Sequence, residues 1–142
     1  YPALVVLDAD VAGGTGTHHF RRAYPDRFIQ LGIAEQNMVG VAAGMALAGC
    51  LPVASTFAVF ALRTIEQVRQ SIAYPRLNVK LAASHPGLDA GPDGASAQAL
   101  EDLAAFRAIP GMAVISPADT GPDGAAGGTA RYRVFCTHWP SF

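Results

Sequence analysis

Short runs of apolar residues alternate along this chain with longer segments in which apolar residues recur at helical spacing. A short apolar run bounded by polar or turn residues is typical of a β-strand that is buried in a parallel sheet. Five such runs predict five strands, at residues 3–7, 28–31, 53–57, 79–84 and 112–115.

Helices are predicted between these strands. The clearest segment is 58–73, which repeats apolar residues at helical spacing and ends before Pro75. One or two helical turns are expected at 18–24 and a longer helix at 34–49. A further helix is expected at 97–109, with Leu100, Leu103, Ala104 and Phe106 facing inward.

Strands that alternate with helices indicate an α/β fold, with a mainly parallel sheet of five or six strands and helices on both faces. In such sheets, ligands bind beyond the carboxyl ends of the strands. Several functional side chains lie at or just after predicted strand ends: Asp10, Glu35, Phe57, His85 and Asp119. We therefore expect the functional site at this edge of the sheet.

The pattern changes after residue 119. Residues 120–129 are rich in glycine and lack a helical period, although an α/β domain normally has a crossover helix at this point. Residues 132–136 fit one last strand, and a loosely ordered tail fits equally well. The sequence thus predicts one domain over 1–119 and an atypical Gly-rich tail over 120–142.

Composition restricts the partners. The chain has 142 residues, which is enough for one domain with a sizeable core. Only 15% of the residues are charged, and the net charge is −1. Because there is no basic run, we expect neither nucleic acid nor a membrane as a partner. The low charge and the many small residues indicate that a partner protein covers part of the surface.

The two cysteines, Cys50 and Cys136, are expected to be buried free thiols, as is usual in a reducing compartment. No leader segment is apparent, and the longest apolar stretch is too short to cross a bilayer. We therefore expect a cytoplasmic protein. Because the first residue is not methionine, we also expect the chain to begin inside a longer one.

Glu35 is the most informative ionisable residue. It lies between a short apolar strand at 27–31 and a helix rich in small residues at 36–49. One interpretation is structural, because an acid at that place complements the positive end of the helix. The other is chemical. Residues 40–62 are almost wholly apolar, so burial is expected to raise the carboxyl pKa and keep a proton available for acid–base chemistry.

Four motifs, in order, resemble the pyrimidine-binding domain of transketolase-like enzymes that use thiamine diphosphate. They read GIAEQNMVGVAAGMALAG, PVASTFAVFALRTIEQVRQSI, ASHPGLDAGPDGAS and IPGMAVISPAD. The resemblance covers residues 3–119. The AEQ motif is also similar to that of a sister family, 1-deoxy-D-xylulose-5-phosphate synthase.

The resemblance implies that Glu35 is catalytic, through a hydrogen bond to a ring nitrogen of the cofactor's aminopyrimidine. Phe60, with Phe57 close by, matches the aromatic platform under that ring. Arg63 is expected to stack on the ring or to bind a substrate phosphate. Asp10 matches an acid near the thiazolium side. The structural alternatives are a helix-core residue for Phe60, a solvated residue for Arg63 and a loop residue for Asp10.

His85 and Asp93 match positions that face the ketose substrate in the family. A structural histidine and an ordinary turn residue are the alternatives. His18 and His19 have no role in the family, and we expect them at the surface or at a helix start.

Departures from the family affect substrate positions. Ala97 stands where the family has a second histidine, and Gly14 lies near the place of a serine that helps hold the sugar phosphate. The arginine that usually follows the last strand has no clear counterpart in the tail. The family's GDG motif, which grips the diphosphate and Mg²⁺, is also absent from the sequence. A partner chain or a further domain is therefore expected to hold Mg²⁺ and complete the site.

The resulting hypothesis is the pyrimidine-binding subunit of a split transketolase-like enzyme that transfers a two-carbon ketol unit from a ketose to an aldehyde. Two copies are expected to pair through the helix with Gly40 and Gly44, together with two diphosphate-binding subunits. One alternative is a deoxyxylulose-phosphate-synthase-like or 2-oxoacid-dehydrogenase-like β subunit. The other is a degenerate, non-catalytic scaffold domain.

Overall fold

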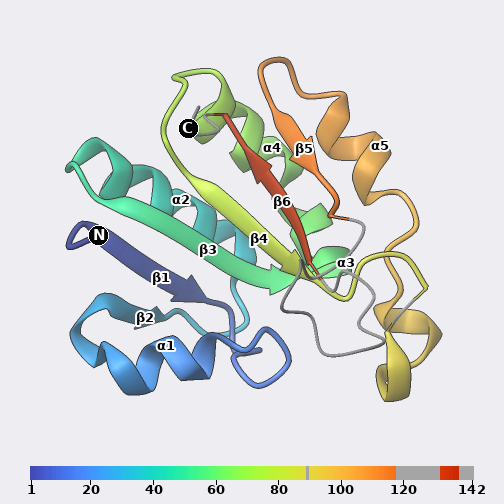
Figure 1. The fold of residues 1–142 in the computed structure, drawn as a ribbon. Helices are drawn as coiled ribbons and strands as arrows, with labels where there is room; N and C mark the ends of the chain where they lie inside the picture. The colour runs from blue at the N-terminus through green and yellow to red at the C-terminus, as the bar shows by residue number, and fades with distance from the viewer. Residues whose placement is uncertain (89, 118–131, 138–142) are drawn as a thin grey trace.

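The computed structural model describes residues 1–88, 90–117 and 132–137. In this part of the chain, six strands form one sheet in the order β2-β1-β3-β4-β6-β5 (Figure 1). Strands β1, β2, β3 and β4 are mutually parallel. The predicted α/β fold with a mainly parallel sheet is therefore confirmed. The strands are β1 (Leu4–Asp8), β2 (Phe28–Gln30), β3 (Leu51–Phe57), β4 (Lys80–Ser84), β5 (Ala113–Ile115) and β6 (Tyr132–Cys136).

Strand β6 is reversed in the sheet and pairs antiparallel with both β4 and β5. An antiparallel neighbour needs no helical crossover, unlike a parallel one. Phe135 of β6 is fully buried, and its ring stacks on Phe106 with 4.0 Å between the ring centres. The interpretation of 132–136 as a last strand is thus confirmed over a loose tail. Asp119 and the predicted boundary after it lie outside the described residues.

Helices connect the parallel strands. The helices α1 (Thr17–Ala23) and α2 (Glu35–Leu47) flank β2, and α5 (Asp102–Arg107) precedes β5. Figure 1 shows α2 and α4 (Ile65–Gln67) behind β3 and β4. Right-handed crossovers place α1 on the opposite face, because β2 and β3 lie on different sides of β1.

The segment 58–73 is helical but not one regular α-helix. It passes through α3 (Ala58–Ala61), a 3₁₀ turn η2 (Leu62–Thr64), α4 and a π-helical stretch η3 (Val68–Ala73). Short 3₁₀ and π segments within helices often mark functional sites. The predicted location is therefore right, and the predicted regularity is wrong.

The helix predicted at 97–109 is wrong over its first half, since α5 begins only at Asp102. Gly87 and Ala99 exchange two backbone hydrogen bonds, of 2.9 and 3.0 Å, and form an isolated antiparallel bridge. This bridge keeps the chain extended before α5. Leu100 follows the bridge and is 69% exposed, and Ala104 of α5 is also exposed, whereas both were expected inside. Phe106 is buried as predicted.

Three shorter turns complete the described secondary structure: η1 (Pro25–Arg27), η4 (Gly91–Asp93) and η5 (Ala95–Ala97). The core lies between the sheet and α2, with Leu7, Met38 and Leu81 among its fully buried side chains. Both cysteines are free. Cys136 is buried as expected, and Cys50 is only half-buried. No helix in the described ranges is both long and apolar enough to cross a membrane.

Candidate functional site

The carboxyl ends of the parallel strands form one edge of the sheet, and four of the predicted site residues lie at this edge. Asp10 follows β1, and Glu35 begins the helix that follows β2. Phe57 is the last residue of β3, and His85 directly follows β4. The local order of strand, short loop and helix thus places each of these residues where ligands bind in parallel sheets.

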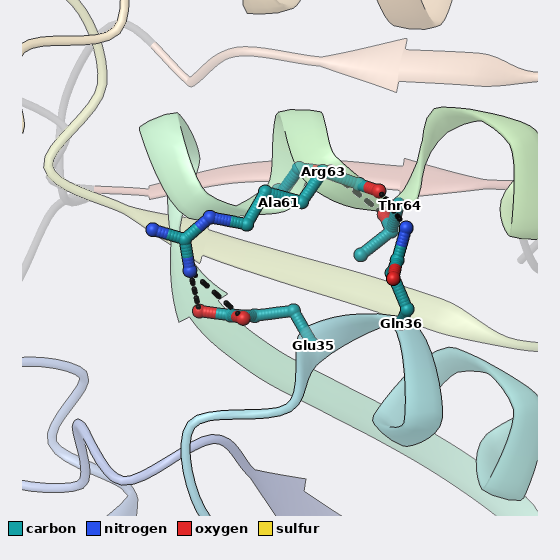
Figure 2. A network of polar contacts seen from close by, with 5 residues as sticks. All are labelled: Glu35, Gln36, Ala61, Arg63 and Thr64. Carbon is teal, nitrogen blue, oxygen red and sulfur yellow. Dashed lines mark hydrogen bonds and ion pairs between the residues drawn. The ribbon is translucent and has the colours of Figure 1, made fainter.

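Glu35 is the first residue of α2, and its side chain is only 4% exposed. Both carboxylate oxygens accept hydrogen bonds from Nη1 of Arg63, at 2.9 and 3.0 Å (Figure 2). No side-chain hydrogen bond caps the start of α2. The hydrogen bonds of Glu35 therefore go to an arginine from another element and not to the free N–H groups of its own helix.

Arg63 links the carboxylate to an aromatic ring. It belongs to the 3₁₀ turn η2, and its side chain is 52% exposed. The guanidinium carbon lies over the Phe60 ring, 4.8 Å from the ring centre. Attraction between a cation and an aromatic face supports this arrangement. Glu35, Phe60 and Arg63, all predicted site residues, are thus brought together.

The backbone around Arg63 is fixed by two polar contacts (Figure 2). The side-chain amide of Gln36 donates to the Arg63 carbonyl oxygen at 3.0 Å, and so ties η2 to α2. The hydroxyl of Thr64, which is fully buried, donates to the Ala61 carbonyl oxygen at 2.7 Å. The same bonds account for the tight turn at η2, because a side-chain donor takes up a backbone acceptor inside the helical segment.

A row of aromatic rings extends from Phe60 through Phe57 to His85. The rings of Phe57 and Phe60 are stacked and nearly parallel, with 5.4 Å between centres and an interplanar angle of 5°. His85 lies on Phe57, with ring centres 3.9 Å apart. A Cβ at Gly14 would come within 2.6 Å of the Phe57 ring, so glycine lets the loop after β1 pack against it. The predicted residues Phe57, Phe60 and His85 therefore form one continuous group.

The two predicted substrate residues also lie together. His85 Nε2 is 3.8 Å from an oxygen of Asp93, which belongs to η4. The other ring nitrogen of His85 is 2.9 Å from the Ser84 hydroxyl. His85 has a positive backbone φ of 55°, which is uncommon for a residue with a side chain and is often found at functional sites.

Next to His85 is a cavity of about 390 Å³. It is lined by His18, His19, Ser84 and His85, together with glycines of the loops after β1 and β4. His18 and His19 were expected at the surface or a helix start, and α1 does start beside them. Sequence reasoning missed their place in the cavity wall, because only the fold brings the loop after β1 against the loop after β4.

Asp10 lies at the predicted edge but is exposed, and its backbone N–H donates to the Gln30 side chain at 2.9 Å. Its neighbour Asp8 is fully buried and organises the loop. The carboxylate of Asp8 accepts hydrogen bonds from the hydroxyls of Thr15 and Thr17 and from the backbone N–H of Val11, at 2.8–3.0 Å. In the sequence, Asp8 and Asp10 are both acids at the end of β1. Only their burial in the structure distinguishes the loop-organising Asp8 from the exposed Asp10.

A buried carboxylate beside a phenyl face can hold a flat nitrogen heterocycle. The carboxylate accepts a hydrogen bond from the ring or its amino group, and the phenyl face stacks on the ring. Glu35 and Phe60 fit such a group, including an aminopyrimidine. Among the described residues, no three His, Cys, Asp or Glu side chains are placed to bind a metal ion.

Comparison with protein families gives a match to the family described as transketolase, pyrimidine binding domain, over residues 1–121. The chain is 52% identical over 120 residues to a putative transketolase C-terminal section of Methanocaldococcus jannaschii. This alignment covers 84% of the chain and 38% of the relative. The chain is also 42% identical over 118 residues to the 6-deoxy-6-sulfo-D-fructose transketolase subunit SqwH of Clostridium sp. (strain MSTE9), covering 82% of the chain and 37% of the relative.

A solved structure is similar as well. It is described as a split gene transketolase, inactive beta4 tetramer, and it matches with a TM-score of 0.64 and 55% sequence identity. The match covers 78% of the chain and 35% of that structure's chain. The chain thus spans less than two fifths of the length of each of these three proteins.

Proposed function

The chain belongs to the family of transketolase pyrimidine-binding domains, and we propose that it is the pyrimidine-binding subunit of a split enzyme that transfers a two-carbon ketol unit with thiamine diphosphate. The observation that supports this most is the buried Glu35 carboxylate beside the Phe60 ring. The reaction is proposed to run from a ketose donor to an aldehyde acceptor. The split-transketolase relatives support a partner-dependent enzyme.

Glu35 and Phe60 are proposed to hold the aminopyrimidine ring. Thiamine diphosphate, when bound, supplies a carbon nucleophile that carries the ketol unit. Glu35 holds or moves a proton at a ring nitrogen, and its burial excludes water from that hydrogen bond. Phe60 stacks under the ring, and Phe57 supports Phe60 from behind. Arg63 contacts both residues, through its ion pair with Glu35 and its position over the Phe60 ring.

The substrate is proposed to bind on the side of the cavity. His85 and Asp93 are proposed to orient hydroxyl groups of the ketose. Both are polar, His85 lines the cavity, and an Asp93 oxygen lies 3.8 Å from His85 Nε2. Asp10 is assigned to the thiazolium side of the cofactor on the strength of its position after β1.

Mg²⁺ and the diphosphate are proposed to lie mainly on a second, diphosphate-binding subunit, because the sequence has no GDG motif. Two copies of the present chain are proposed to pair through α2, where Gly40 and Gly44 are exposed and leave room for close packing. Two diphosphate-binding subunits complete a heterotetramer, located in the cytoplasm.

The test is turnover of a ketose and an aldehyde when this chain is mixed with a diphosphate-binding subunit that carries GDG. Glu35→Gln is expected to lower kcat about 10²- to 10⁴-fold, the range typical of a lost acid–base group. Glu66→Gln, an exposed glutamate in α4, is the matched control and is expected to leave kcat unchanged. Full activity of Glu35→Gln would contradict the proposed mechanism. No turnover and no cofactor binding by the mixture would favour a scaffold.

A further inference from the structure

Arg63 already makes both contacts that the proposed site offers to a bound ring. Its Nη1 donates to both oxygens of the Glu35 carboxylate (Figure 2). Its guanidinium carbon also lies over the face of Phe60. A carboxylate and a phenyl face together select a flat group with N–H donors. The side chain of Arg63 is itself such a group, since a guanidinium is planar and carries its donors in the plane.

We propose that Arg63 is an internal competitor for the aminopyrimidine and thereby determines how tightly, and for which ring, the site binds. This inference rests on the proposed function of Glu35 and Phe60. A carboxylate with both oxygens occupied cannot accept a new N–H donor in the same direction. A ligand ring therefore has to replace the guanidinium at Glu35 and at Phe60 together.

The arginine is held loosely enough to be replaced. Both hydrogen bonds to Glu35 come from one nitrogen, whereas the strongest arginine–carboxylate pairs use two nitrogens in a fork. The side chain is also 52% exposed, so water can solvate the guanidinium once it turns away. The cost of opening the pair therefore falls on the buried Glu35 carboxylate, and a ligand ring with N–H donors compensates it.

The backbone does not have to move for this exchange. The Gln36 amide holds the Arg63 carbonyl, and Thr64 closes the turn through its bond to Ala61. These contacts fix the Cα of Arg63, while the guanidinium beyond it is hydrogen-bonded to Glu35 and lies over the Phe60 ring. Displacement is therefore a rotation of one exposed side chain, which is a fast motion.

With such a competitor, the apparent affinity for every ligand equals the intrinsic affinity multiplied by the fraction of molecules in which Arg63 has left the site. It also gives selectivity. A ring with N–H donors compensates Glu35 for the lost guanidinium, whereas a ring without donors leaves a buried carboxylate unpaired. Arg63 is in this sense a specificity-determining residue for the binding step.

The experiment is a calorimetric titration of thiamine diphosphate into this chain assembled with a diphosphate-binding subunit. Arg63→Gln removes the competing cation and keeps a side chain of similar reach. It is expected to bind thiamine diphosphate about three- to tenfold more tightly than the unchanged chain, as removal of a weak ion pair predicts. Arg69→Gln removes the same charge from an exposed place in η3 and is expected to bind as the unchanged chain does.

The outcomes separate the inference from the function on which it rests. Equal or weaker binding by Arg63→Gln, with Glu35→Gln still impaired, overturns the competitor and leaves the proposed function intact. Unaltered binding by Glu35→Gln, or no binding by the unchanged assembly, overturns the proposed function and the inference together. Tighter binding by Arg63→Gln but not by Arg69→Gln supports both.

A second measurement tests the pair without any ligand. A double-mutant cycle on the unfolding of the chain compares Glu35→Gln, Arg63→Gln and the double variant. The two substitutions are expected to be coupled by about two- to fivefold in the unfolding constant, as for an ion pair with one exposed partner. Additive effects would mean that the pair is not formed in solution and would overturn the inference.

Discussion

In the described part of the chain, two acidic side chains begin α-helices and pair with an arginine from a distant part of the chain. Glu35 begins α2 and pairs with Arg63, and Asp102 begins α5 and pairs with Arg133 of β6. Both carboxylates are buried, at 4% and 0% exposure. The arginines differ. The side chain of Arg63 is 52% exposed, and that of Arg133 is 14% exposed.

Because of this difference in arginine exposure, we expect the Glu35–Arg63 pair to open far more easily than the Asp102–Arg133 pair. When Arg63 leaves Glu35, its half-exposed guanidinium reaches water. When Arg133 loses Asp102, its charge stays buried between α5 and the sheet, and its Nε already has no hydrogen-bond partner among the described residues. A broken buried pair leaves an uncompensated charge, which is far more costly than an exposed one. We therefore expect the first pair to serve the site and the second to hold the fold.

The largest effect on stability is expected from Asp102→Asn. This change keeps the shape of the side chain and removes the charge that compensates Arg133. We expect a loss of about 3–5 kcal/mol in the free energy of unfolding, the usual cost of breaking a buried pair on one side. Urea unfolding followed by circular dichroism measures it.

The double variant with Asp102→Leu and Arg133→Met is the control, because it removes both charges and leaves apolar side chains of similar size. It is expected to recover most of the lost stability. If Asp102→Asn cost less than about 1 kcal/mol, the typical value of an exposed pair, the contrast between the two pairs would be wrong.

A much smaller effect is expected from Glu35→Gln in the same unfolding experiment. The exposed guanidinium of Arg63 regains water when its partner is neutral, so we expect a change of less than about 1 kcal/mol in either direction. The same variant is expected to lose most of its activity, which is the signature of a residue that serves the site. A loss of stability as large as that of Asp102→Asn would place Glu35 among the residues that hold the fold.

The sequence predicts the sheet and its functional edge because both depend on local patterns. Apolar runs mark the strands, and the residues that follow them include Glu35, Phe57 and His85. Their place at one edge follows from the geometry of parallel strands. The insertion of β6 between β4 and β5 is not local, so it cannot be derived from the pattern of 132–136 alone.

The interpretation of Glu35 shows the same limit within the site. Its burial follows from the apolar residues beside it, and the structure confirms that burial. Its partner, Arg63, lies 28 positions away and meets it only because α2 packs against η2. The first half of the helix predicted at 97–109 failed for a related reason, since two hydrogen bonds between Gly87 and Ala99 outweigh the local preference for helix.

The smallest expected effect is on the pH dependence of stability. It tests whether Cys136, at the C-terminal end of β6, is as firmly buried as Arg133 of the same strand. Cys136 lies opposite Lys80 of β4, and burial raises the pKa of the Cys136 thiol above its ordinary value of 9.0, with Lys80 opposing the shift. From pH 9.0 up to the raised pKa, the folded protein keeps a proton that the unfolded chain releases. The free energy of unfolding contributed by this thiol therefore falls as the pH rises.

Lys80 acts in the opposite direction and has to be removed from the comparison. Burial lowers the pKa of Lys80 from 10.5, so between the lowered pKa and 10.5 the unfolded chain holds the extra proton and stability rises with pH. Urea unfolding at about pH 8 and pH 10 is therefore measured in a Lys80→Gln background, with and without Cys136→Ala. The loss of stability between the two pH values is expected to be larger with Cys136 present. Equal losses would mean that the end of β6 opens to water and that only the Arg133 part of the strand is held.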